Sequence, residues 1–335
     1  MEPLTHALAS LTLSRAGFNR RTKLAPAILL VAGTAADADW ITYLFGPGAF
    51  VAGHRTLTHS LLGTIAVALV VSAAFTYATR KREAFRVPFR QAFLLSAAAA
   101  TLHLALDLCD SYGAALLWPF SRKWFAADWL AGLDLAVLGV LLAGLLLPSL
   151  FALVSEEIGA RKKGPRGRRG AILALVVLAL YVGGRALLHE KAAAILEARS
   201  YRREFPRRVA AFPEATSPLE WRGIVETESA MHQALVSLAP GASFDPDTGI
   251  TIFKPEPSAI LESAQQTRAA RDFLSFARFP KATVQKTADG YTVEMRDLRF
   301  GALGDTSFAV MAIVELDLQG RVVSQDLRYQ DRDTR

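Results

Sequence analysis

Several histidines and aspartates of this 335-residue chain lie inside or beside long apolar stretches, where such residues are rare. The group consists of His6, Asp37, Asp39, His54, His59, His103, Asp107 and Asp110. One acid in the hydrocarbon of a bilayer costs about 2.5–3.5 kcal/mol on insertion scales, so several unpaired acids would be strongly disfavoured. Because few cations lie in the same stretches, a bound divalent metal is the natural partner of these carboxylates.

The spacing of these residues indicates which of them can act on one ion. His103, Asp107 and Asp110 stand at i, i+4 and i+7, so an α-helix would place all three on one stripe. Asp37 and Asp39 are two residues apart, so they point to different sides of a regular helix. We therefore expect the helix to break near residues 33–36, which are small, so that both acids can face the site.

His54 and His59 lie where a loop leads into the next apolar stretch. Their imidazoles converge most readily if His54 lies in the loop and His59 in the first helical turn. Thr56 or Thr58 is the expected cap of that turn. Arg55 lies between the histidines, and its forked guanidinium suits a phosphate, so we expect it to steady an anionic substrate. Its alternative role is to anchor the protein at lipid headgroups.

The ligand types indicate which metal to expect. Imidazole and carboxylate without thiolate suit zinc, manganese, iron or cobalt, and they disfavour calcium as the sole ion. The chain has one cysteine, Cys109, which we expect to be a small core residue. The candidates outnumber the ligands of one tetrahedral ion, so we predict one or two divalent ions, with zinc preferred. Two ions could activate a water and clamp both oxygens of a displacement.

The helices that must position these residues are long enough to cross a membrane, which takes about 20 apolar residues. Candidate spans cover residues 24–45, 57–79, 92–117, 129–154 and 171–188. A shorter amphipathic segment at residues 3–18 carries His6 and is expected to be re-entrant. Asp128 and Asp134 lie near the start of one span, where acids favour the helix dipole, so we favour a capping role over a place in the site.

The formal net charge of +7 is a topology signal rather than a nucleic-acid footprint. Basic residues gather in the short connections near residues 15–23, 80–90 and 161–169, as expected of cytoplasmic loops. With these connections in the cytoplasm, the acids and histidines share one layer near the outer surface. The expected partners are the lipid bilayer and a lipid or small phosphoester substrate, and no nucleic acid is expected. The sequence does not indicate the oligomeric state.

The sequence divides into two predicted domains. Residues 1–190 form an α-helical polytopic membrane domain with about five spans and a short N-terminal helix. Residues 191–335 form an extracytoplasmic domain of α+β or β-rich type, which opens with a charged helix at residues 190–203. Alternating residues and the turn pairs Asp289-Gly290 and Gln319-Gly320 predict a small antiparallel sheet in the C-terminal part.

Several motifs of the N-terminal half occur in a known combination. They are Thr5-His6, Ala36-Asp37-Ala38-Asp39, His54-Arg55 with Thr58-His59-Ser60, His103 with Asp107, and the run from Ser111-Tyr112-Gly113 to Trp118-Pro119-Phe120. In this combination residues 1–150 resemble the YdjM (DUF457) family of bacterial inner-membrane proteins, which are described as metal-dependent hydrolases. That family is distantly similar to zinc-dependent phospholipase C and the P1-type nucleases. The resemblance implies that one aspartate doubles as general base and that the following residues bind zinc: His6, Asp37 or Asp39, His59, His103 and Asp107.

The leading hypothesis is a multi-pass inner-membrane hydrolase with a periplasmic C-terminal domain. It would cleave a phosphoester or other ester of a lipid or periplasmic substrate through a metal-activated water, with Asp37, Asp39 and Arg55 as catalytic residues. The alternative is a metal-ion or proton transporter, because intramembrane His and Asp also mark ion paths. A transporter needs a route from both faces, whereas the polar residues gather near one. A third hypothesis is a membrane scaffold with a structural metal.

Overall fold

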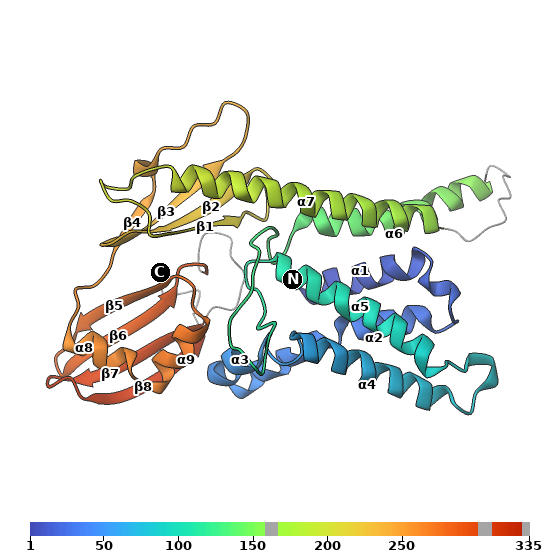
Figure 1. The fold of residues 1–335 in the computed structure, drawn as a ribbon, viewed down its shortest axis with the longest axis horizontal. Helices are drawn as coiled ribbons and strands as arrows, with labels where there is room; N and C mark the ends of the chain where they lie inside the picture. Colours follow the sequence, from blue (N-terminus) through green and yellow to red (C-terminus); the bar gives the residue numbers. More distant parts are fainter. Residues whose placement is uncertain (158–166, 301–309, 330–335) are drawn as a thin grey trace. The chain divides into compact units, whose positions relative to one another are not determined.

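The structure is a computed structural model that describes residues 1–157, 167–300 and 310–329. The chain divides into two compact units. The first unit contains Met1–Asp39, Arg55–Leu187 and Ala215–Pro218. The second unit contains Trp40–His54, Leu188–Glu214 and Leu219–Arg335. Helices dominate the first unit and strands the second (Figure 1).

The helices that build the first unit follow the apolar stretches of the sequence. Their bounds are α1 Pro3–Arg15, η1 Phe18–Arg20, α2 Ala25–Thr34, η2 Ala36–Phe45, α4 Leu61–Thr79, η3 Glu83–Phe85, α5 Phe89–Cys109, α6 Leu135–Glu157 and α7 Arg168–Glu197. The 3-10 helix η2 continues into the second unit, as does α7. Because α5 ends at Cys109, the predicted span 92–117 is too long at its C-terminal end: Asp110 has an extended backbone and ends the helix.

Among the described residues, three helical segments are long and apolar enough to cross a membrane: Leu61–Thr79, Glu83–Cys109 and Arg168–Glu197. The pair α2 and η2 makes a fourth span if it counts as one, with a bend of 41° at the break. The apolar part of α6, Leu135–Phe151, is shorter. The structure thus confirms a polytopic helical half and gives three or four apolar spans where the sequence predicted about five. The break falls at Ala35, within the stretch where it was predicted.

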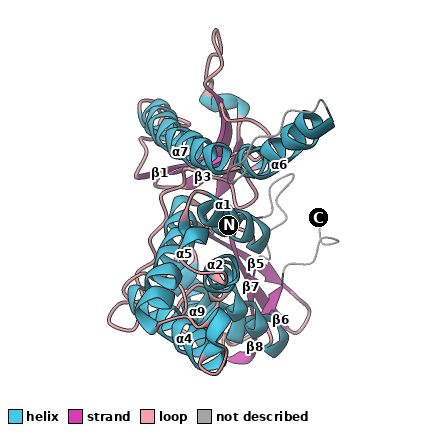
Figure 2. Cartoon of the chain, turned by 90° about the vertical axis from the view of Figure 1, so that its right-hand side faces the viewer, coloured by secondary structure: helices cyan, strands magenta, loops and turns pink. Residues whose placement is uncertain are grey.

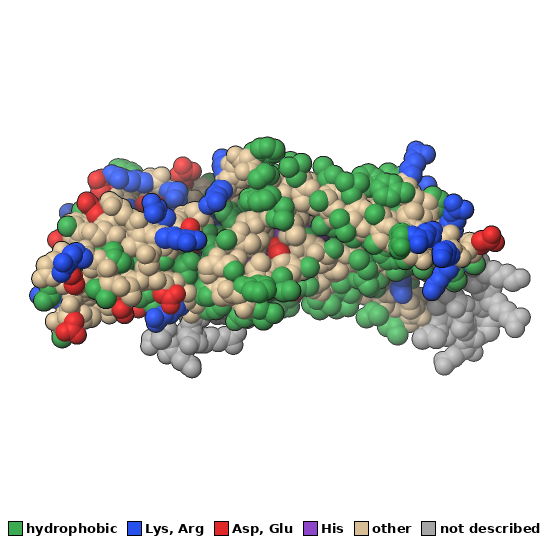
Figure 3. Space-filling view, turned by 90° about the horizontal axis from the view of Figure 1, so that it is seen from below, with side chains coloured by type: hydrophobic (Ala, Val, Ile, Leu, Met, Phe, Trp, Pro, Cys, Tyr) green, Lys and Arg blue, Asp and Glu red, His purple; other side chains and the backbone are tan. Residues whose placement is uncertain are grey.

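The face of the helical unit that Figure 3 shows is largely covered by apolar side chains. Large apolar side chains of α4 and α7 are between two-fifths and three-quarters exposed, among them Leu62, Leu69, Val70, Leu173 and Leu180. The side of α4 that faces the protein carries the small residues Ala68 and Ser72. A continuous apolar surface of this kind is expected of helices that contact lipid. Small residues where helices meet allow the close packing on which membrane helices depend.

The basic connections of the first unit meet at one end of the helices. Arg168 Nε, ahead of α7, donates to the carbonyl of Ala16, which lies 3.1 Å away at the end of α1. Lys23 Nζ lies 5.4 Å from the ring centroid of Phe85, in the connection between α4 and α5. Residues 161–166 of the third basic cluster lie outside the described residues. The contacts of the described part place the basic connections on the same side, as the charge pattern predicts.

The second unit consists of two antiparallel sheets and short helices (Figure 2). The first sheet has the order β1-β2-β3-β4, with β1 Arg208–Pro213, β2 Glu220–Glu226, β3 Ala230–Ser237 and β4 Ile250–Phe253. The second has the order β5-β6-β7-β8, with β5 Pro280–Lys286, β6 Gly290–Asp297, β7 Val310–Asp317 and β8 Val322–Tyr329. The helices are α3 Pro47–Gly53, α8 Ala259–Gln265 and α9 Arg268–Phe276, with η4 Pro246–Thr248 before β4.

The sheet predicted for the C-terminal part is confirmed by β5–β8. Gly290 starts β6 after the first predicted turn, and Gly320 has a φ of 78° in the second, a conformation that favours glycine. The sheet β1–β4 lies in a part of the chain for which no sheet was predicted. The predicted charged helix at residues 190–203 is wrong as a separate element, because α7 continues without a break to Glu197.

The segment Trp40–His54 packs within the second unit. The ring of Tyr43 stacks on Tyr329 of β8 at 4.4 Å between centroids, and the Tyr329 hydroxyl donates to the Tyr43 carbonyl at 3.1 Å. Phe50 of α3 is 1% exposed and meets Tyr329 edge to face. The segment that joins Asp39 to Arg55 is therefore held by the last strand of the chain.

Candidate metal centre

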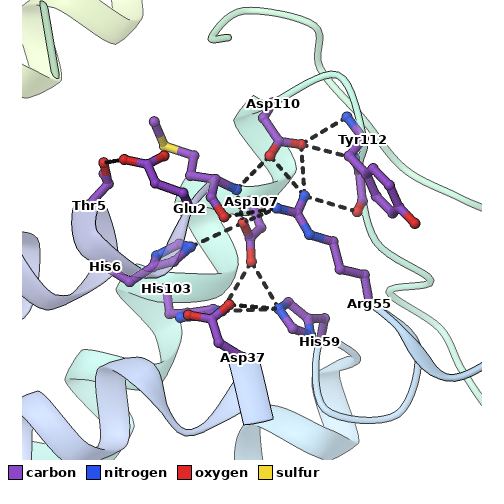
Figure 4. Close-up of polar contacts among 12 residues, drawn as sticks. Glu2, Thr5, His6, Asp37, Arg55, His59, His103, Asp107, Asp110 and Tyr112 are labelled. Atoms are coloured by element: carbon purple, nitrogen blue, oxygen red, sulfur yellow. Dashed lines mark hydrogen bonds and ion pairs between the residues drawn. The ribbon is translucent and has the colours of Figure 1, made fainter. Parts of the chain in front are cut away.

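The polar cluster of the first unit is assembled from four places in the chain. His6 comes from α1, Asp37 from the break after α2, and His59 from the loop ahead of α4. His103 and Asp107 come from one face of α5, four residues apart. Figure 4 shows these side chains turned toward one another. All are nearly or fully buried, with exposures from 0% for His59 and Asp107 to 8% for Asp37.

Three potential ligand atoms at the centre lie close enough together to bind one metal ion. Nε2 of His59 lies 3.1 Å from Nε2 of His103. Oδ2 of Asp107 lies 3.1 Å from the His59 nitrogen and 3.0 Å from the His103 nitrogen. Ligands of a tetrahedral zinc ion, each bound at about 2.0–2.1 Å, stand about 3.3 Å apart. Asp37 Oδ1, at 3.8 Å and 4.0 Å from the two nitrogens, is placed as a fourth ligand.

The remaining ring nitrogens of the two histidines have fixed partners. Nδ1 of His103 lies 2.8 Å from the carbonyl oxygen of Gly33, so it carries the hydrogen and donates it. Nδ1 of His59 lies 3.0 Å from Oδ2 of Asp39, which also accepts from the Thr58 hydroxyl at 2.8 Å. Both rings therefore turn Nε2 to the centre. Outer partners of this kind orient the histidine ligands of known metal sites.

A second group shares two of these residues. His6, His103 and Asp107 also place ligand atoms within 4.8 Å of one another. The rings of His6 and His103 stack at 3.7 Å, and Nε2 of His6 lies 3.2 Å from Oδ1 of Asp107. Among the described residues, Oδ2 of Asp37 and Oδ2 of Asp107 are buried without a hydrogen-bond partner. Buried polar atoms without partners are costly, and a divalent cation would satisfy these oxygens, so the residues present fit a metal ion.

Arg55 contacts the far side of the same carboxylate. Its Nη2 lies 3.0 Å from Oδ1 of Asp107, and its Nη1 lies 2.9 Å and 2.8 Å from the two oxygens of Asp110. Burial disfavours the Arg55 cation, but these carboxylates outweigh that effect and raise the pKa of Arg55 above its ordinary value. The amino group of Met1 contacts both carboxylates as well. With Arg55 only 6% exposed, its contacts are those of a residue that positions Asp107, and a direct contact with substrate stays a prediction.

Two further site residues act around the cluster rather than in it. Asp39 accepts from the backbone amide of Arg55 at 2.9 Å, in addition to orienting His59. Asp110 accepts from the amides of Tyr112 and Gly113 at 2.9 Å and 3.0 Å. Arg55 has a φ of 53°, an uncommon conformation for a residue with a side chain. These contacts fix the loop that presents Arg55 and His59.

His54 is placed differently from the other predicted ligands. Its ring stacks on Phe50 at 4.6 Å and meets Trp40 edge-on at 4.9 Å. Among the described residues it belongs to neither group that can hold a metal. Asp128 and Asp134 belong to neither group in the same part of the chain.

The helix caps and orienting groups were the least visible in the sequence. The prediction that Thr56 or Thr58 caps the helix is wrong: Ser60 is the N-cap of α4, and its Oγ accepts from the Gly63 amide at 2.9 Å. The sequence did indicate this cap, because Ser60 stands directly before the apolar run that begins at Leu61. Asp134 does cap α6, accepting from the amides of the second and third residues after it at 3.1 Å. The sequence could not indicate that the Gly33 carbonyl orients His103, because every residue has a backbone carbonyl.

Two family models match the chain. The YdjM inner membrane protein model matches residues 1–192, and the YfhP C-terminal alpha/beta plait domain model matches residues 259–333. No curated protein and no solved structure matches the chain. The first match contains the whole polar cluster, and the second contains the sheet β5–β8 with α8 and α9. The chain therefore belongs to the YdjM inner membrane protein family and carries a C-terminal α/β plait.

Proposed function

We propose that this protein is a membrane-bound, metal-dependent hydrolase that cleaves a phosphoester or other ester of a lipid or periplasmic substrate. The observation that carries the proposal is the triangle of His59 Nε2, His103 Nε2 and Asp107 Oδ2, with sides of 3.0–3.1 Å. Its corners are two imidazole nitrogens and one carboxylate oxygen, all of them buried, which is a donor set that suits a divalent cation. Zinc is the metal preferred by this ligand set, with manganese and iron as further candidates.

We assign different roles to the residues of the cluster. His59, His103, Asp107 and Asp37 would hold the ion, which supplies a water acidic enough to ionise near neutral pH. Asp37 is the most exposed of these residues, and its Oδ2 has no hydrogen-bond partner among the described residues. We therefore assign Asp37 as the general base that takes up a proton from water. Asp39 and the Gly33 carbonyl keep the two imidazoles in the tautomer that the site requires.

The placement of the site in the helices suggests the side of the membrane on which it works. Helix α5 begins beside a basic connection and ends at the cluster, with Asp107 in its last turn. If the basic end is cytoplasmic, as the positive-inside rule predicts, the cluster lies at the outer leaflet of the bacterial inner membrane. Helix α7 starts from the same basic end, so in this orientation the C-terminal domain would lie in the periplasm. A site at this depth can meet a lipid headgroup without extracting the lipid.

Elemental analysis of the full-length protein in detergent tests the proposal, together with hydrolysis of a phospholipid in mixed micelles and of a soluble phosphodiester. The wild type should bind a divalent metal and hydrolyse at least one of these probes. His59→Ala and Asp107→Asn should lose both metal and hydrolysis. His189→Ala, a histidine of the second unit, serves as the matched control and should keep both. Equal metal contents in wild type, His59→Ala and Asp107→Asn would overturn the assignment of the site.

One alternative function has an observation in its favour. His103 and Asp107 lie inside a segment that can cross a membrane, Glu83–Cys109, and intramembrane residues of these types also mark ion pathways. Metal uptake by proteoliposomes that hold the full chain, without hydrolysis of either probe, would favour a transporter and contradict the hydrolase.

A further inference from the structure

The carboxylate of Asp107 has two oxygens with separate surroundings. Oδ2 faces Nε2 of His59 and Nε2 of His103 at 3.1 Å and 3.0 Å. Oδ1 faces Nη2 of Arg55 at 3.0 Å and Nε2 of His6 at 3.2 Å. A carboxylate with one oxygen toward each of two positions is the bridge found in sites that hold two ions about 3.5–4 Å apart.

One of these two positions is held by cationic groups of the chain itself, the Arg55 guanidinium and the Met1 amino group. The guanidinium of Arg55 reaches Asp107 with one nitrogen and both oxygens of Asp110 with the other, at 2.8–3.0 Å. A guanidinium does not lose its proton in proteins, so this charge is permanent. Its side chain is 7% exposed, which leaves little water to screen it from a neighbouring cation.

The loop around Arg55 keeps that cation in place. The Arg55 amide donates to Asp39 at 2.9 Å, and the guanidinium carbon lies 5.0 Å from the ring centroid of Tyr112. Asp110 is fixed in turn by the amides of Tyr112 and Gly113. Arg55 cannot swing away to admit an ion without breaking charge-assisted hydrogen bonds at both ends.

A metal ion in the second group would have to share an oxygen with Arg55. That group uses His6, His103 and Asp107, and the Asp107 oxygen next to His6 is the one that Arg55 already holds. Two cations on one buried oxygen repel strongly, because the interior screens charge far less than water does. Among the described residues, no arginine or lysine contacts Asp107 Oδ2, which faces His59 and His103.

We infer that the site holds one divalent ion, at His59, His103, Asp37 and Asp107 Oδ2, and that Arg55 occupies the place on Asp107 which a second ion would take. The inference rests on the proposed metal site and narrows its stoichiometry. Arg55 is then a positioning residue: it fixes Asp107 and replaces a metal charge. His6 acts as a ring stacked on His103 and a partner of Asp107 rather than as a ligand of a second ion.

Metal stoichiometry of the full-length protein, saturated with Mn²⁺ and freed of excess ion, tests the inference. The wild type should bind one ion per chain and give the electron paramagnetic resonance spectrum of isolated Mn²⁺. Two ions per chain with an exchange-coupled spectrum would overturn the inference and leave the metal-dependent hydrolase intact. Absence of any bound ion would overturn the proposed function itself.

Variants of Arg55 provide a second test of the inference. Arg55→Met removes the guanidinium from Asp107 Oδ1 and Asp110 and leaves the Met1 amino group beside them. Its stoichiometry should rise above one toward two, whereas Arg55→Lys should stay at one. Arg299→Met is the matched control, because Arg299 is a buried arginine of the second unit with Nε 2.9 Å from Asp297 Oδ2. It should bind one ion. An Arg55→Met protein with one ion and wild-type affinity would contradict the inference; if that variant does not fold, the wild-type spectrum decides.

Discussion

His103 is oriented by the backbone of Gly33, whose carbonyl oxygen lies 2.8 Å from Nδ1 of the ring. Gly33 can approach because it has no side chain: a Cβ there would lie 1.9 Å from Oγ of Ser10 in α1. The close packing of α1 on α2 and the orientation of a candidate metal ligand therefore depend on the same glycine. A substitution that separates the helices should also disturb the site.

Gly33→Ala is expected to weaken metal binding. The added methyl group would collide with Oγ of Ser10, so the Ser10 side chain must turn or α1 and α2 must separate; a shift of α2 moves the Gly33 carbonyl that orients His103. Loss of an outer partner of a metal ligand typically costs about 10–100-fold in affinity, and overpacking costs about 1–3 kcal/mol of stability. Competition with a chelating indicator measures the affinity, and thermal unfolding measures the stability.

Two variants control the Gly33 prediction. Ser10→Ala removes the atom nearest to the new methyl group, so the double variant should regain part of the lost affinity. Gly139→Ala adds a methyl group where nothing lies within 4 Å in α6, and it should bind metal as the wild type does. Equal affinities of Gly33→Ala and Gly139→Ala would show that the Gly33 carbonyl does not orient the site.

Asp39→Asn is expected to lower metal affinity by about 10-fold or more, because a neutral amide holds Nδ1 of His59 less firmly than a carboxylate does. Asp134→Asn is the matched control in the same unit. Asp134 caps α6 and accepts from the Tyr181 hydroxyl at 3.2 Å; because asparagine is about as good an N-cap as aspartate, Asp134→Asn should lose little stability and no metal. Metal loss from Asp134→Asn but not from Asp39→Asn would reverse these roles.

Tyr329 is expected to hold the segment Trp40–His54 in the second unit. Tyr329→Phe loses one hydrogen bond and about 1 kcal/mol, whereas Tyr329→Ala also loses the ring stack and about 3 kcal/mol. Chymotrypsin should then cut the alanine variant faster after Tyr43 or Phe50. Val323 lies on the same strand, and its side chain is 69% exposed, so the control variant Val323→Ala should be cut at the wild-type rate. Equal cleavage of all three variants would contradict this packing.

Glu204 is expected to make the stability of the second unit depend on pH. The hydroxyl and amide of Ser229 donate to its carboxylate at 2.6 Å and 3.0 Å and lower the pKa of Glu204 from 4.5 to about 2. A lowered folded-state pKa stabilises the fold above the unfolded-state value, and the effect fades as pH falls through the folded-state value.

Ser229→Ala should therefore lower the melting temperature of the protein most at neutral pH. The difference from the wild type should shrink as the pH falls from 4.5 to about 2, where Glu204 becomes protonated in both proteins. Ser275→Ala is the control, because the Ser275 hydroxyl donates to a backbone carbonyl that does not titrate in this range. A Ser229→Ala difference that stays constant with pH would rule out the Glu204 contact as its source.

The local features of the site could be predicted because they follow from helix geometry. His103 and Asp107 are one helical turn apart, and the structure places both in the same group. The break after α2 was expected because two acids at i and i+2 cannot share one face of a helix. The capping role of Asp134 followed from its place before an apolar run. Each of these inferences uses residues within a few positions of one another.

The remaining features depend on contacts between residues that are far apart in the sequence. The pairing of Arg55 with Asp110 spans 55 residues, and no local period reveals which carboxylate a buried arginine will reach. The orienting role of Gly33 belongs to its backbone, which side-chain patterns do not report. The strands β1 and β4 have no regular alternation of buried and exposed residues, so the first sheet was not visible as such.

The hydrogen bond between Tyr329 and Tyr43 joins positions 286 residues apart. A ribosome must therefore synthesise the chain through β8 before the loop between Asp39 and Arg55 can meet its partner strand. Contacts this distant form late, and chains generally fold from the N-terminal part onward during synthesis. The loop that presents Arg55 should thus be among the last parts of the protein to mature, after its neighbouring helices have entered the bilayer.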